Sequence, residues 1–97
     1  MKEYRIVCNR KCVHSDGKVY NYSNSAVWVT GSSLPRYTVY NYKADAIKAL
    51  SDTIRKAKAF DAKTQKLLAS GDPLAVGYWQ SDIRIQSRNV TKWDDCK

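Results

Sequence analysis

The fold of this chain is decided by the stretch KADAIKALSDTIRKAKA, which covers residues 43–59. Its apolar side chains recur every three or four positions and therefore form one stripe along a helix; they are Ala46, Ile47, Leu50, Ile54 and Ala57. At about 100° per residue, basic side chains fall on the opposite side; they are Lys48, Arg55 and Lys56. No glycine, proline or β-branched run interrupts the pattern. The stretch predicts an amphipathic helix with its stripe on the core.

A second, shorter helix is expected directly after the first. Residues 60 and 61 mark a break or bend, and Asp61 is a residue type that caps helix N-termini. The second helix would run to about Ala69, because Ser70-Gly71-Asp72-Pro73 is a strong stop signal. Lys63 and Lys66 would extend the basic side if the two helices were continuous.

Alternation of period two predicts strands on both sides of the helical region. The expected strands cover residues 4–8, 19–22, 26–30, 36–42 and 77–88, with 90–93 as a continuation of the last one. In the strand at 77–88, uninterrupted alternation places Trp79, Ile83 and Ile85 on one face and leaves a polar outer face.

The predicted fold class is α+β, in one domain covering residues 1–97. A small antiparallel sheet would carry one main helix and a short second helix on one face, in the order β-β-β-β-α-α-β. A chain of 97 residues is long enough for one small domain and too short for two ordinary ones.

The charge balance points to polyanionic or acidic partners. Seventeen Lys and Arg oppose nine Asp and Glu, which gives a formal net charge of +8. Such a balance favours nucleic acid or an acidic protein surface, although solubility alone accounts for it equally well. No apolar run reaches membrane-spanning length, and the N-terminus MKEYRIVCNRKC does not have the pattern of a signal peptide. The expected location is the cytoplasm, the host cytoplasm if the protein comes from a phage, with its three cysteines as thiols.

The cysteines and the single histidine are weak candidates for metal binding or catalysis. Cys8, Cys12 and His14 with the distant Cys96 could supply a tetrahedral zinc site, but the spacing lacks the usual CxxC knuckle. His14 is the single histidine, there is one Glu, and no phosphate-binding glycine loop is present. We therefore expect no metal, no cofactor and no enzymatic activity.

The candidate binding residues combine dispersed cations with aromatic side chains. The cations are Lys48, Arg55, Lys56, Lys63, Lys66, Arg84 and Arg88, and the aromatic anchors are Tyr78, Trp79 and Trp93. Tyrosines with nearby Lys or Arg can stack on single-stranded RNA or DNA. They also pack at protein interfaces. Both interpretations stay open at this point.

The stretch RIQSRNVTKWDD, residues 84–95, resembles the tail of small phage and prophage accessory proteins. In those proteins a strand of the type R-I-Q-S-R is followed by V-T-x-W and acidic residues. The resemblance covers about an eighth of the chain and transfers no functional residue. It implies a phage protein that inhibits or redirects host machinery, as anti-CRISPR and other anti-defence factors do. The resulting hypothesis is a non-enzymatic inhibitor that binds a host protein or ribonucleoprotein; the alternative is a direct nucleic-acid-binding protein.

Overall fold

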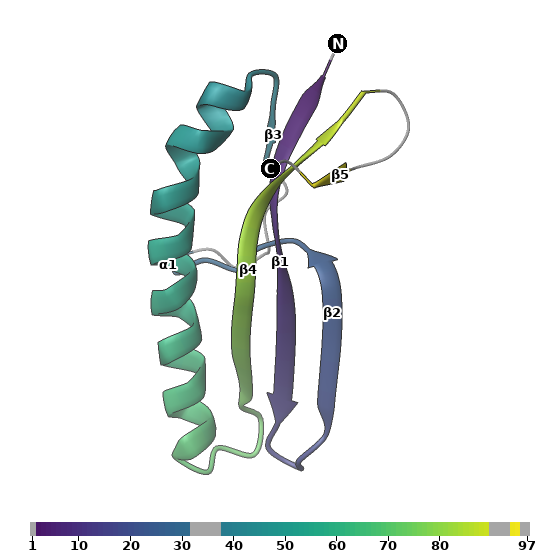
Figure 1. Cartoon of the computed structure of the whole chain (residues 1–97). Coiled ribbons are helices and arrows are strands. Elements are labelled where there is room, and N and C mark those ends of the chain that lie inside the picture. Colours follow the sequence, from purple (N-terminus) through teal and green to yellow (C-terminus); the bar gives the residue numbers. More distant parts are fainter. Residues whose placement is uncertain (1, 32–37, 90–93, 96–97) are drawn as a thin grey trace.

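One long helix lies along a curled antiparallel sheet in the computed structural model of the protein, which describes residues 2–31, 38–89 and 94–95 (Figure 1). The elements are β1 (Glu3–His14), β2 (Val19–Ser25), β3 (Val39–Tyr40), α1 (Lys43–Ala69), β4 (Val76–Arg88) and β5 (Asp94–Asp95). The five-stranded sheet has the order β2-β1-β4-β5, and β3 pairs with β1 as well. The α+β class and the antiparallel sheet are confirmed, but the described residues form one helix instead of two.

The predicted helix break is wrong because Asp61 has a different role from the expected cap. Asp61 lies in the middle of α1 and is only 8% exposed, on the side that faces the sheet. Its carboxylate accepts hydrogen bonds from β4, so the helix continues through this position. The predicted stop is confirmed. Gly71 has a φ of +85°, a conformation that glycine adopts without strain, and its N–H donates to the Leu68 carbonyl.

The predicted apolar stripe is only partly buried. Ala46 and Ala57 are fully buried and Leu50 packs against the core, whereas Ile47 is 54% exposed. A narrow sheet covers only the middle of a stripe about 100° wide, and Ile47 lies at the margin. The small alanines let the helix approach the strands closely.

A β-bulge in β4 changes which residues of this strand face α1: even-numbered residues do so before the bulge, and odd-numbered residues do so after it. Asp82 has a φ of +52°, and the pairing of β1 with β4 shifts register between Val7 and Asn9. Before the bulge Gln80 faces α1, and after it Ile85 does so. The predicted uninterrupted alternation is therefore wrong, and Trp79 does not share a face with Ile85.

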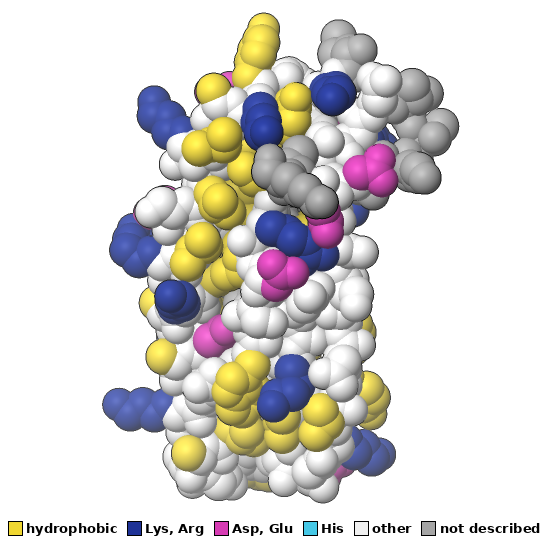
Figure 2. Space-filling model, viewed as in Figure 1, with side chains coloured by type: hydrophobic (Ala, Val, Ile, Leu, Met, Phe, Trp, Pro, Cys, Tyr) yellow, Lys and Arg dark blue, Asp and Glu magenta, His cyan; other side chains and the backbone are white. Residues whose placement is uncertain are grey.

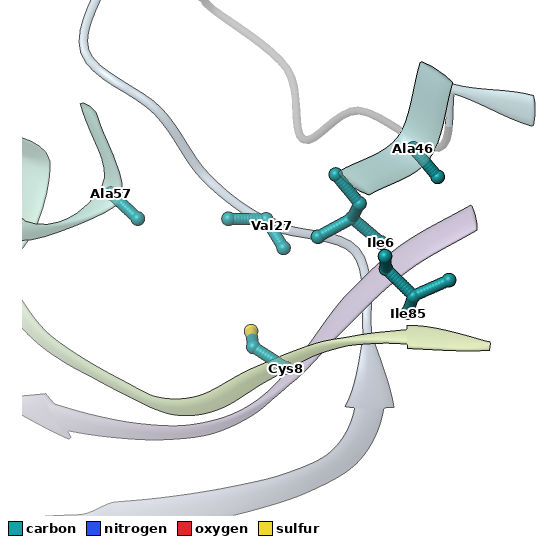
Figure 3. Packing of buried hydrophobic residues seen from close by; sticks show 6 residues of the cluster. All are labelled: Ile6, Cys8, Val27, Ala46, Ala57 and Ile85. Carbon is teal, nitrogen blue, oxygen red and sulfur yellow. The ribbon is translucent and has the colours of Figure 1, made fainter. Parts of the chain in front are cut away.

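The core lies between α1 and the central strands. Ile6 and Ile85 lie next to each other near Ala46, and Val27 lies between them and Ala57 (Figure 3). Cys8 completes this buried cluster.

The remaining strands differ in extent from the prediction. β1 is longer than residues 4–8, because it pairs with β4 from Glu3 to His14. Residues 26–30 form no strand beyond a single bridge at Val27, since the backbone of Trp28 pairs with a side-chain amide instead. Of residues 36–42, only Val39–Tyr40 forms a strand, and residues 36, 37 and 90–93 lie outside the described part. Among the described residues, no helix combines the length and the apolar character needed to cross a membrane.

Candidate functional site

An open hollow of about 470 Å³ crosses the middle of β2, β1 and β4. Two cations, Arg10 and Lys11, and two aromatic residues, Tyr22 and Trp79, contribute to its lining. Asparagine and serine residues of the three strands and Asp61 of α1 supply most of the rest. This combination suits a partner that offers carboxylates together with hydrogen-bonding groups.

The Arg10 guanidinium is held between two tyrosine rings. Its central carbon lies 4.6 Å from the ring centroid of Tyr22 and 5.4 Å from that of Tyr78. The Nε atom is buried and has no hydrogen-bond partner among the residues that the structure describes. Stacking on tyrosine fixes the direction of the guanidinium without neutralising its charge.

Lys11 and Trp79 form a second cation and aromatic pair on the opposite face of the sheet. They are direct partners across β1 and β4, and the Lys11 ammonium lies 5.1 Å from the Trp79 ring centroid. Neighbouring residues of a strand point to opposite faces, so Lys11 lies on the face away from Arg10. Trp79 remains 37% exposed and is available to a partner.

A partly buried polar network joins β4, α1 and the segment after β2. The Gln80 side-chain amide accepts a hydrogen bond from the Trp28 N–H at 2.7 Å and donates to the Trp28 carbonyl at 2.8 Å. It also donates to Asp61 Oδ1 at 2.8 Å, while the Gln80 N–H donates to Asp61 Oδ2 at 2.7 Å. The Gln80 side-chain amide thus binds the backbone N–H and carbonyl of Trp28 in the way that the peptide group of a neighbouring strand would. Cys8 lies against the same amide, and burial raises the pKa of its thiol to about 11.

We expect Asp61 to contribute more stability in acid than at neutral pH. Burial raises the pKa of this carboxyl, while hydrogen bonds from Gln80 oppose the rise. The contribution is therefore fully present below the pKa of the unfolded chain and is lost as pH rises through the higher pKa of the folded state. Urea titrations of the wild type and Asp61→Asn, between about pH 3 and about pH 8, measure it. The stability difference between the two proteins should fall as pH rises; a constant or rising difference would contradict the assignment.

The predicted basic residues of the helix lie on its outer side. Lys48, Arg55, Lys63 and Lys66 are exposed, and Lys56 is partly so. Asp52 sits among them and forms ion pairs with Arg55 at 2.5 Å and Lys56 at 3.1 Å. Exposed pairs of this kind contribute little to stability.

The predicted strand arginines lie on the other side of the molecule and already have acidic partners. The Arg84 side chain is 17% exposed and pairs with Asp82 at 3.3 Å and Asp95 at 3.0 Å. Arg88 pairs with Glu3 at 2.7 Å. Because Ile85 faces α1, Arg84 faces away from it. The seven predicted cations therefore do not form one surface, and Figure 2 shows Lys and Arg side chains spread over the visible face.

The three predicted aromatic anchors have different surroundings. Tyr78 belongs to a cluster in which its ring lies 5.2 Å from Phe60 and 5.6 Å from Trp28. Trp79 lies at the hollow, as described. Trp93 lies outside the described residues. Tyr78 is thus a packing residue in the structure, and only Trp79 is placed as an exposed anchor.

The expected thiols also take structural positions. Cys8 and Cys12 are free and buried, whereas Cys96 lies outside the described residues. The His14 ring packs edge-on against Tyr20 at 5.2 Å. In the described ranges, no three His, Cys, Asp or Glu side chains are grouped as metal ligands would be.

Sequence reasoning missed Arg10 and Lys11, although it weighed the tyrosines of β2, Tyr20 and Tyr22, as stacking or interface residues. Arg10 and Lys11 come directly after the strand predicted for residues 4–8, in a polar stretch to which no element was assigned. Apolar residues return at Cys12 and Val13, after the polar stretch. A strand that continued from Tyr4 to His14 through polar residues would have included Arg10 and Lys11.

Comparisons of the chain with protein-family models, with curated proteins and with solved structures found no significant match.

Proposed function

We propose that the protein is a non-enzymatic, phage-type binding protein that inhibits or redirects a host protein or ribonucleoprotein in the host cytoplasm. One observation carries this proposal: the cations are divided between two sides of the molecule, and Arg84 and Arg88 are engaged with acidic side chains. A nucleic-acid backbone that lay along the helix lysines would not reach the strand arginines.

Both faces of the sheet near the hollow carry residues typical of a protein interface: Tyr20 and Tyr22 lie on the face of Arg10, and Trp79 lies on the face of Lys11. Tyr20, Tyr22 and Trp79 are each between 37% and 45% exposed. Arg10 and Lys11 lie beside two of these rings. Interfaces are enriched in Tyr, Trp and Arg, and their binding energy concentrates in a few such anchors. These cation and aromatic pairs therefore support a protein target more than a phosphate backbone.

Direct nucleic-acid binding is the second candidate function. It is favoured by the outer side of α1, where Lys48, Arg55, Lys63 and Lys66 are all exposed. Such a surface would bind phosphates without reading sequence. It would use the helix alone.

A capture experiment separates the two functions. The tagged protein is incubated with bacterial lysate at physiological salt, with and without nuclease, beside the charge-reversal variant Arg55→Glu/Lys56→Glu and the anchor variant Trp79→Ala. We expect a protein partner to survive nuclease treatment, the charge reversal to leave capture nearly intact, and the anchor variant to release the partner faster.

The opposite pattern would overturn the proposal. Labelled DNA and RNA would then bind tightly at physiological salt. The affinity would fall by about 0.7–0.9 log units per log unit of salt for each phosphate contacted. The charge reversal would weaken all nucleic-acid sequences alike.

A further inference from the structure

We infer that the open edge of β2 binds an acidic, extended segment of the partner protein as an added strand. This inference rests on the proposed function, because it names how that partner docks. β2 is the last strand of the sheet, at the right of Figure 1, and in the described part of the chain it pairs only with β1. Val19, Tyr20 and Tyr22 are between 44% and 50% exposed.

The edge of β4 next to α1, on the opposite side of the sheet, is covered by side chains of the helix. Along the free edge of β4, helix side chains satisfy the backbone groups. Thr64 accepts a hydrogen bond from the Tyr78 N–H at 3.0 Å, and Gln65 donates to the Tyr78 carbonyl at 2.8 Å. Asp61 accepts from the Gln80 N–H. β2 has no equivalent cover among the described residues.

The sequence of β2 also lacks the usual protection of an edge strand. Natural edges are kept short, or carry Lys, Pro or inward-pointing charges that prevent pairing. β2 has seven residues, VYNYSNS, with no charge and no proline. The bulge at Asn24, which has a φ of +53°, ends the regular part, so residues 19–23 form the available edge.

The pairing register identifies which backbone groups face the open edge. The His14 N–H donates to the Lys18 carbonyl, so even-numbered residues of this part of β1 point their backbone groups toward β2. Their partners Tyr20 and Tyr22 point back toward β1. Since these directions alternate along a strand, the N–H and C=O of Asn21 point outward.

The charges around this edge specify an acidic occupant. Arg10 stacks on Tyr22, and Lys11 is the direct partner of Asn21. The one acid of the adjoining turn, Asp16, accepts a hydrogen bond from the Lys18 N–H. A second copy of the chain would bring another net charge of +8 to the same edge. An extended segment with Asp or Glu beside its strand residues fits better.

The test uses a blocked peptide of alternating Val and Glu, a matched peptide with Lys in place of each Glu, and the full-length protein. Amide chemical shifts and hydrogen exchange locate the binding. We expect the acidic peptide to slow exchange at Asn21 and Val19, and the basic peptide to bind at least about tenfold more weakly.

Two variants of one residue isolate the backbone contact. Asn21→Pro removes an outward N–H, which an edge strand tolerates. Asn21→Ala removes the same side chain and keeps the N–H. The proline variant should lose peptide binding by at least about tenfold, because a backbone hydrogen bond is removed, while the alanine variant retains it.

Several results would overturn the inference. They are no binding of the acidic peptide, equal binding of the basic peptide, shifts confined to α1, or exchange protection of β2 that grows with protein concentration alone. If the lysate partner survives nuclease treatment while the peptide fails, only this inference is wrong. If nucleic acid alone is captured, the proposed function is wrong, whatever the peptide does.

Discussion

Replacing Gln80 with alanine is expected to lower the free energy of unfolding by about 3–5 kcal/mol. The substitution leaves the Trp28 N–H, the Trp28 carbonyl and Asp61 Oδ1 without the partners they have in the folded protein. Each buried polar group without a partner costs about 1–3 kcal/mol. The total free energy of unfolding of a small domain is about 5–15 kcal/mol, so such a loss removes a large fraction of it. Denaturant titration followed by fluorescence measures the change.

The control is the neighbouring residue on the same strand. Ser81 is exposed and makes one long contact, at 3.4 Å, with the Asn9 carbonyl. Ser81→Ala should change stability by less than about 0.5 kcal/mol. Equal losses for the two variants would show that the Gln80 amide is not a structural link between β4 and the segment after β2.

Truncating Ile6 is expected to destabilise the protein by about 2–5 kcal/mol, and truncating Ile47 by less than about 1 kcal/mol. The chemical change is identical, so only the surroundings differ. Ile6 is 5% exposed and packs in the cluster with Ala46 and Ile85. Ile47 is 54% exposed. Matched Ile→Ala variants in one denaturant titration compare the two positions.

This pair of variants also tests the placement of the helix. If Ile47→Ala cost as much as Ile6→Ala, α1 would be rotated about its axis relative to the structure. A loss confined to Ile6 confirms that the alanine side of α1 is the buried side.

Sequence reasoning reached the α+β class, the main helix, the helix stop after Ala69 and the strand at 77–88 because these depend on local periodicity and turn residues. It failed at Asp61 and at the bulge around Asp82 because both depend on contacts between distant segments. Asp is a common helix N-cap residue, and only the approach of Gln80 makes Asp61 a buried acceptor.

The candidate site was predictable only in part for the same reason. Exposure of Lys48, Arg55, Lys63 and Lys66 follows from helical spacing alone. The separation of Arg84 from them does not, since it requires knowing which face of β4 the helix covers. The hollow depends on three strands meeting, and a single strand carries no signal for it.

The pairing of β1 with β4 determines when this chain can fold. Arg88 donates a hydrogen bond to Glu3, and 85 positions along the chain separate the two residues. The central strand pair therefore cannot form until residues 76–88 have left the ribosome, and until then the strands available to pair with β1 are β2 and the short β3. Contacts between such distant segments slow folding. During that interval the nascent hairpin presents apolar β1 residues that only the completed chain covers, which makes it the stage most exposed to aggregation.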